Sequence, residues 1–173
     1  MMTWFWLLFA VILIFGFVVF RGAPYVPTHK KELAKAFDEL YPLSEHDTLV
    51  DIGSGDGIVL REAAKRKATA VGYELNPVLV LISRLLSRGQ PRITTHLADF
   101  WFVHLPAETT IVYVFGESRD IAKIAKKVES EAKRLNKPLA LISYAFVVPD
   151  VPCVKKVGAY HLYQFNTLQA NEA

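Results

Sequence analysis

The residues best suited to chemistry lie in the segment LVDIGSGDGIVL, residues 49–60, which begins like a buried strand and ends like a helix. Three glycines, Gly53, Gly55 and Gly57, fall where the strand should turn into the helix. Glycines at such a turn allow unusual backbone angles and let a ligand approach the main chain, while the helix start offers free N–H donors. The segment therefore predicts a loop that binds a nucleotide-like ligand.

The spacing of the glycines narrows the ligand class. In the pattern G-x-G-x-G, Ile58 stands where the dinucleotide fingerprint G-x-G-x-x-G needs a glycine. The loop also lacks the lysine and the hydroxyl residue of a P-loop. Asp51 and Asp56 place carboxylates beside it, which disfavours a pyrophosphate and favours a cationic ligand or one with an ammonium group.

Two further carboxylates follow expected strands. Glu74, 21 residues after Gly53, ends the second strand, where an acidic side chain can accept hydrogen bonds from both ribose hydroxyls. Asp99 follows the third strand, where it could accept a hydrogen bond from an exocyclic amine, and Phe100 and Trp101 could contact a base. The site would then combine a loop that accepts positive charge, a carboxylate that binds a ribose and an aspartate that accepts a hydrogen bond from an amine. These three features match the groups of S-adenosylmethionine.

Helical and strand patterns alternate along the chain. Strands are expected at 48–52, 69–75, 92–98, 110–115 and 138–146, and helices at 29–40, 57–67, 77–88 and 119–136. Asn76 is expected to cap the third helix, and a hairpin turning at Gly158 and Ala159 is expected to close the chain. This order predicts an α/β fold with a Rossmann-like, doubly wound, mostly parallel sheet that binds its ligand at the carboxyl ends of the strands.

The N-terminus has a different composition from the rest of the chain. Of the first 20 residues 18 are apolar, and Trp4 to Phe20 carries no charge. Basic residues follow this run and none precedes it, which favours an uncleaved transmembrane helix over a cleaved signal peptide; the alternative is a buried core helix. We therefore expect a membrane anchor at 1–21, a linker at 22–28 and one catalytic domain at 29–173, as a single-pass membrane protein with its catalytic domain on the cytoplasmic side.

Length and charge limit the other function classes. A chain of 173 residues suits a single domain, and a net charge of +3 does not indicate a nucleic-acid-binding surface. The single cysteine excludes an intrachain disulfide. The five histidines show no metal-ligand spacing, so no metal is predicted.

The ordered motifs VDIGSGDG, VGYELNP and LADF resemble those of the class I S-adenosylmethionine-dependent methyltransferases. More narrowly, an apolar N-terminal segment followed by PYVPT, DIGSGDG, AVGYELNP, DFW and VYVFG resembles the membrane-anchored lysine methyltransferases that modify the ATP synthase c subunit and the adenine nucleotide translocase. The resemblance implies the compact seven-strand methyltransferase fold, S-adenosylmethionine as methyl donor and a lysine of a membrane or membrane-associated protein as acceptor.

The residue chemistry and the resemblance together give a set of predicted site residues. Those expected to bind the cofactor are Tyr25, Pro27, Thr28, Asp51, Ile52, Gly53, Ser54, Gly55, Gly57, Glu74, Leu75, Asn76, Asp99, Phe100 and Phe115. From the resemblance, Tyr25 would also help to shape the lysine channel. Glu117, on the opposite wall, would hold the incoming ammonium or accept its proton.

Each of these roles has a simpler alternative. Glu74 could cap the helix that follows it, and Asp99 could be an ordinary loop residue. Tyr25 could merely pack the linker, and Glu117 could be a first-turn helix residue that the helix dipole favours.

Three other functions stay open beside methylation of a protein lysine. The acceptor could be a lipid, a quinone or another small membrane-soluble molecule, or the chain could be a non-catalytic scaffold that kept the fold. Methylation of a nucleic-acid amino group is disfavoured, because FGES, residues 115–118, stands where an N-P-P-Y-type motif would be needed.

Overall fold

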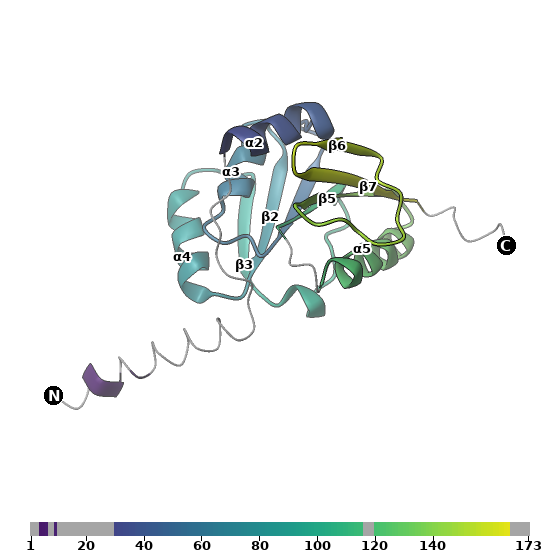
Figure 1. The fold of residues 1–173 in the computed structure, drawn as a ribbon. Helices are drawn as coiled ribbons and strands as arrows, with labels where there is room; N and C mark the ends of the chain where they lie inside the picture. The colour runs from purple at the N-terminus through teal and green to yellow at the C-terminus, as the bar shows by residue number, and fades with distance from the viewer. Residues whose placement is uncertain (1–3, 7–8, 10–29, 116–119, 167–173) are drawn as a thin grey trace.

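One seven-stranded sheet organises the chain in the computed structural model, which describes residues 4–6, 9, 30–115 and 120–166 (Figure 1). The strands are β1 (Thr48–Ile52), β2 (Thr69–Glu74), β3 (Ile93–Leu97), β4 (Ile111–Val114), β5 (Leu139–Tyr144), β6 (Lys155–Val157) and β7 (Tyr160–Phe165). Their order is β3-β2-β1-β4-β5-β7-β6. β1 to β5 run parallel, and β7 pairs antiparallel with both β5 and β6. The predicted parallel sheet and closing hairpin are confirmed.

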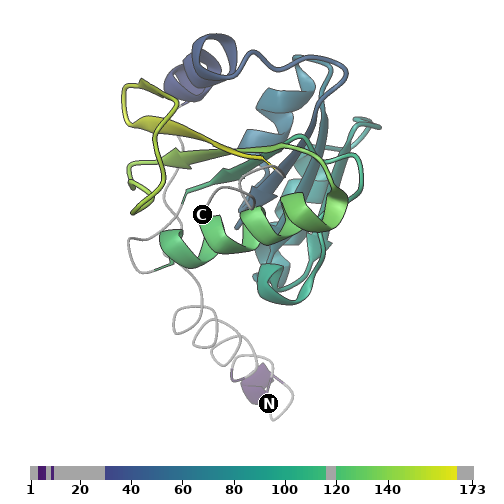
Figure 2. The ribbon, with the colours of Figure 1, turned by 90° about the vertical axis from the view of Figure 1, so that its right-hand side faces the viewer.

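Helices cover both faces of this sheet. α2 (Lys30–Lys35), the π-helical turn η1 (Ala36–Leu40) and α3 (Ile58–Ala64) pack on one face, and α4 (Pro77–Leu86) lies beside α3 at the outer edge (Figure 1). α5 (Ile121–Leu135) and the short 3-10 helix η2 (Phe100–Phe102) pack on the other face (Figure 2). Because the sheet is covered on both faces, β1 and β4 are buried along nearly their whole length instead of alternating between buried and exposed residues.

Local signals set most element boundaries. Asn76 caps α4 as predicted, because its side-chain oxygen accepts a hydrogen bond from the N–H of Val78 at 3.0 Å. The hairpin reverses at Gly158, whose φ of +59° lies in the left-handed region. The helix expected at 29–40 differs: α2 gives way to the wider turn η1, in which the N–H of Tyr41 bonds the carbonyl of Ala36.

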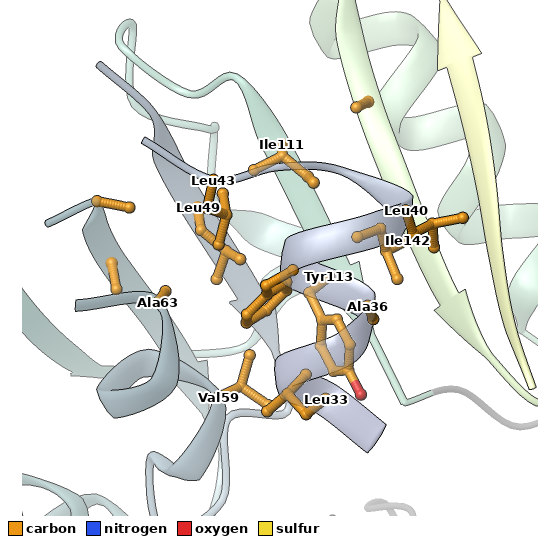
Figure 3. Packing of buried hydrophobic residues seen from close by; sticks show 14 of the residues in the cluster. Leu33, Ala36, Leu40, Leu43, Leu49, Val59, Ala63, Ile111, Tyr113 and Ile142 are labelled. Atoms are coloured by element: carbon orange, nitrogen blue, oxygen red, sulfur yellow. The ribbon is translucent and has the colours of Figure 1, made fainter. Parts of the chain in front are cut away.

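The core beneath α2 is formed by side chains from widely separated segments. Leu33, Ala36 and Leu40 point from α2 and η1 toward Ile111, Tyr113 and Ile142 of the central strands (Figure 3). This packing fixes α2 over the middle of the sheet.

Arg66, just beyond α3, ties α2 to α3. Its guanidinium donates to the carbonyl of Ala34 at 3.0 Å and to Oε1 of Glu62 at 2.8 Å, and it lies over the Phe37 ring at 5.7 Å. Burial alone would raise the pKa of Glu62, but hydrogen bonds from Lys65 and Arg66 outweigh burial and lower it. The buried carboxylate therefore depends on its cationic partners.

Replacing Arg66 by Ala is expected to lower the free energy of unfolding by about 2 kcal/mol, because it leaves the Glu62 carboxylate and the Ala34 carbonyl short of donors. Urea denaturation measures the change. Lys65→Ala is the matched control, since the Lys65 side chain is 66% exposed and its ion pair with Glu62 should contribute less than about 1 kcal/mol. Equal losses in the two variants would contradict this account of Arg66.

The predicted single-pass membrane localisation is contradicted by the structure. Within residues 4–6, 9, 30–115 and 120–166, no helix has both the length and the apolar character needed to cross a bilayer. The 15 residues of α5 rise only about 22 Å, and lysines line its exposed side. Most of the predicted anchor (1–21) and all of the linker (22–28) lie outside the described residues.

Candidate active site

The predicted site residues within the described chain gather at the carboxyl edge of the sheet, beside the β1–β4 junction where the strand order reverses. Ile52 pairs with Val114, and Val114 pairs with Ser143. Gly53 and Phe115, which follow β1 and β4, and Tyr144, the last residue of β5, therefore lie side by side. In sheets of this kind that junction is where ligands bind.

The glycine loop after β1 is built from left-handed backbone. Gly53, Gly55 and Gly57 have φ of +72°, +54° and +80°, which other L-residues rarely adopt. The N–H groups of Gly53 and Ser54 donate to the carbonyl of Tyr73, at 2.9 and 3.2 Å, which fixes the loop to β2. A Cβ on Gly53 would meet no atom within 4 Å, so the space beside the loop is open to a ligand.

Glu74 joins the loop to the end of β2. Its Oε2 accepts the N–H of Gly55 at 2.9 Å, and its Oε1 accepts the N–H of Asn76 at 2.8 Å. The side chain thus supports both the glycine loop and the start of α4. Each carboxylate oxygen has a second acceptor site, so two ribose hydroxyls can still donate to it.

Asp51 is a buried carboxylate beneath the loop. Its side chain is 2% exposed, and its Oδ2 has no hydrogen-bond partner among the described residues. Burial raises the pKa of Asp51 well above the ordinary carboxyl value, and the nearby carboxylates of Glu74 and Asp56 raise it further. An unpartnered carboxylate in this position is suited to bind a cation.

Asp99 and Phe100 form the turn after β3. Oδ1 of Asp99 accepts the N–H of Trp101 at 3.0 Å and caps η2, while Phe100 is buried. Lys127 of α5 holds this turn: its Nζ donates to the carbonyls of Trp101 and Val103, at 3.1 and 2.8 Å, and lies 4.9 Å from the Phe100 ring centroid. The sequence did not indicate Lys127, because the lysines of its helix have the spacing of a solvated face.

A row of aromatic rings continues the site beyond the loop. Phe115 stacks on Tyr144, with ring centroids 4.7 Å apart and planes at 21°, and Tyr144 meets Tyr160 edge-on at 4.8 Å. Burial raises the pKa of Tyr160, which stays a neutral phenol. Tyr144 was missed at the sequence level, because only the β4–β5 and β5–β7 pairings bring it beside Phe115.

The remaining predicted residues divide into three groups. Ile52 packs toward α5, and Leu75 and Asn76 are half-buried between β2 and α4. Ser54 is buried with its hydroxyl against β2, where a Cβ on Gly72 would come within 2.5 Å of it. Four lie outside the described residues: Tyr25, Pro27, Thr28 and Glu117.

Comparison with protein families decides the class of this chain. Residues 51–155, from the carboxylate beneath the loop to the first residue of the hairpin strand β6, match the family model described as the ANTKMT methyltransferase domain. The chain belongs to this family. The predicted family is confirmed, and with it the enzyme class and S-adenosylmethionine as the cofactor at the level of the family.

Similar proteins from mammals carry a more specific name. The human lysine N-methyltransferase named for the ATP synthase c subunit is 36% identical over 155 residues, which are 86% of this chain and 64% of the human protein. The mouse protein of the same name is 36% identical over 113 residues, 62% of this chain and 44% of that protein. The chain thus spans less than two thirds of the length of these relatives.

Solved structures share the fold. An RNA methyltransferase from Salinibacter ruber in complex with S-adenosyl-L-homocysteine has a TM-score of 0.69 at 23% identity, covering 81% of this chain and 92% of that one. A putative methyltransferase, YhhF, from Escherichia coli has a TM-score of 0.58 at 19% identity, covering 83% and 90%. At these identities the likeness concerns the fold alone.

Proposed function

We propose that this protein transfers the methyl group of S-adenosylmethionine to the side-chain amine of a lysine in an acceptor protein. The observation that carries the proposal is Asp51, a buried carboxylate with an unpartnered oxygen, directly beneath a left-handed glycine loop that is open at Gly53. A neutral or anionic nucleotide would gain no charge attraction from such a carboxylate. A cofactor that carries a sulfonium and an ammonium would be attracted to it.

The chain's own residues have distinct tasks in binding the cofactor. Asp51 offers negative charge to its cationic end, and the glycine loop lets it approach the backbone. Glu74 accepts from the ribose, and Asp99, held at the η2 turn, accepts from the exocyclic amine of the base. Phe100, buried beneath Lys127, holds the turn that places Asp99.

Bound S-adenosylmethionine supplies a methyl carbon on a positively charged sulfur. The lysine ammonium gives up one proton before transfer; its neutral nitrogen then forms a bond to the methyl carbon as the carbon–sulfur bond breaks, which leaves a methylated ammonium and a neutral sulfur. The lysine must reach the site without its proton, although the reference pKa of its ammonium is about 10.4. The Phe115–Tyr144 stack, next to the loop, removes water from the amine and so favours the neutral form.

Two measurements test the proposal. Calorimetry should detect binding of S-adenosylmethionine to the full chain, and mass spectrometry should then find methyl groups added to lysine in a purified ATP synthase c subunit, the protein after which the relatives are named. Absence of cofactor binding would rule out the enzyme. In a second assay, membranes replace the purified c subunit and the cofactor carries a labelled methyl group. If the chain binds the cofactor and the label is recovered with the extracted lipid, the acceptor is a small membrane-soluble molecule.

Tyr144→Ala is expected to lower kcat/KM for the acceptor about tenfold and to leave the Kd of S-adenosylmethionine within about twofold, because the ring lines the acceptor side of the site. Tyr144→Phe is the matched control: it keeps the stack on Phe115 and should retain the wild-type rate. A loss in the phenylalanine variant equal to that in the alanine variant would mean that the hydroxyl, and not the ring, does the work.

A further inference from the structure

The helix α4 carries an apolar surface that no described element covers. Only Val80 and Ser83 of its ten residues are buried. Leu79 is partly buried, and five further apolar side chains are between 36% and 61% exposed: Val78, Leu81, Ile82, Leu85 and Leu86. Soluble surfaces carry scattered apolar residues, but five on one short helix form a patch that marks an interaction site.

The spacing of these residues indicates what kind of partner they fit. Val78, Leu81, Ile82 and Leu85 follow the i, i+3, i+4, i+7 pattern and share one face of the helix. We call this face of four residues the α4 seam. On such a face the side chains form ridges that can pack into the grooves of another helix. α4 is the outermost helix on its face of the sheet (Figure 1), so within residues 30–115 and 120–166 no helix lies beyond it.

This seam starts at the cofactor site. Asn76 caps α4 and donates its backbone N–H to Glu74, which holds the glycine loop. On β3, Leu97 is 55% exposed and lies on the same face as Thr95, whose hydroxyl bonds Ser83 of α4 at 2.8 Å. A partner on the seam would therefore lie alongside the edge of the catalytic site.

The charge around the seam has one sign. Residues 75–98 contain Arg84, Arg88 and Arg92 and no aspartate or glutamate. The guanidinium of Arg84 is bound to the carbonyl of Thr95 at 2.8 Å, whereas Arg88 and Arg92 are exposed. A second copy packed on this face about a two-fold axis would bring arginines together without a carboxylate between them, which disfavours self-association. The charge fits a partner with acidic groups.

We propose that the α4 seam is the docking surface for the acceptor protein, which packs an apolar helix on Val78, Leu81, Ile82 and Leu85 and places carboxylates near Arg88 and Arg92. This inference rests on the proposed function and names the surface that selects its substrate. When a helix of the acceptor packs on α4, an acceptor lysine outside that helix is free to reach the aromatic row beside the glycine loop. The seam thus governs recognition of the whole protein and not the chemistry at the amine.

The test compares two acceptors: purified ATP synthase c subunit in detergent, and a short soluble peptide that contains only its methylated lysine and the flanking residues. In the full chain, Leu81→Glu with Leu85→Glu should raise KM for the c subunit at least about tenfold. The rate with the peptide and the Kd of S-adenosylmethionine should not change. Val154→Glu, at a side chain 62% exposed and distant in sequence from the seam, is the matched control and should change none of these values. Arg88→Gln with Arg92→Gln should weaken the salt dependence of KM for the c subunit alone.

Three results would overturn the inference, and each differs from a failure of the proposed function. Unchanged KM for the c subunit in the Leu81→Glu, Leu85→Glu variant would show that the seam does not bind it. Loss of sedimentation with phosphatidylcholine–phosphatidylglycerol vesicles, with unchanged methylation in detergent, would assign the seam to lipid. Loss of a wild-type dimer with unchanged methylation would assign it to a second copy. A wild-type chain that binds the cofactor but methylates neither acceptor would instead refute the proposed function, and with it this inference.

Discussion

An Asp51→Asn chain is expected to bind S-adenosylmethionine about 100-fold more weakly than the wild type and to unfold at a higher temperature at pH 7. The loss of affinity follows because a charge-assisted contact in a buried site contributes about 3 kcal/mol. The gain in stability follows because the wild-type carboxylate is buried without a partner for Oδ2 and has two other carboxylates nearby. The same residue is therefore unfavourable for the fold and favourable for the ligand.

The stability of the wild-type chain should change with pH in a direction that can be checked. The pKa of Asp51 in the folded chain lies well above 3.8, so between pH 3.8 and that raised pKa the folded chain holds a proton that the unfolded chain has lost. Stability then falls as the pH rises through this interval. Thermal melting of the wild type should show this fall, and the Asn variant should lack the part that Asp51 causes.

Cofactor affinity should change in the opposite direction. A cationic ligand favours the ionised carboxylate, so in the wild type binding releases a proton and strengthens as the pH rises toward the raised pKa of Asp51. Asp150→Asn is the control, because Asp150 is exposed, and its φ of +60° is a conformation that asparagine adopts readily. Calorimetry in buffers of different ionisation enthalpy measures the proton release. A variant with wild-type affinity, or one less stable than the wild type at pH 7, would contradict this role of Asp51.

The parts of the fold that depend on neighbouring residues could be read from the sequence. Asn76 followed by Pro77 predicted the start of α4, and Gly158 predicted the closing hairpin, because caps and turns are decided within a few residues. The three glycines after β1 predicted the left-handed loop for the same reason. Alternating strands and helices then left few arrangements of the sheet possible.

Contacts between distant segments could not be read in the same way. Tyr144 had the pattern of an ordinary strand residue, and only its register with Tyr160 and its place beside Phe115 bring it to the site. Lys127 lies in a helix whose lysines suggested solvent, yet its ammonium bonds two carbonyls of the η2 turn. Asn76 and Pro77 predicted the helix α4, but a sequence does not say that this helix stands at the edge of a sheet with its seam exposed.

Gly57→Ala is expected to lower the free energy of unfolding by about 3 kcal/mol and to weaken S-adenosylmethionine binding about tenfold. Part of the loss comes from φ of +80°, which costs an L-residue about 1–2 kcal/mol. The rest comes from crowding, because a Cβ on Gly57 would lie 2.3 Å from Oγ of Ser83, and crowding in a packed site costs about 1–3 kcal/mol. Ser83 is fully buried and bonded to Thr95, so it cannot move aside without breaking that hydrogen bond.

Gly89→Ala separates these two causes. Gly89 has almost the same φ, +81°, but a Cβ there would meet nothing within 4 Å. It should therefore show the conformational part alone, about 1 kcal/mol, with an unchanged Kd for the cofactor. Adding Ser83→Ala to Gly57→Ala should relieve the crowding, so that the double variant loses about 1 kcal/mol less than the sum of the two single variants. Equal losses at Gly57 and Gly89 would mean that only the backbone angle matters, whereas a larger loss at Gly57 that Ser83→Ala relieves would show that α4 holds the glycine loop in its ligand-binding shape.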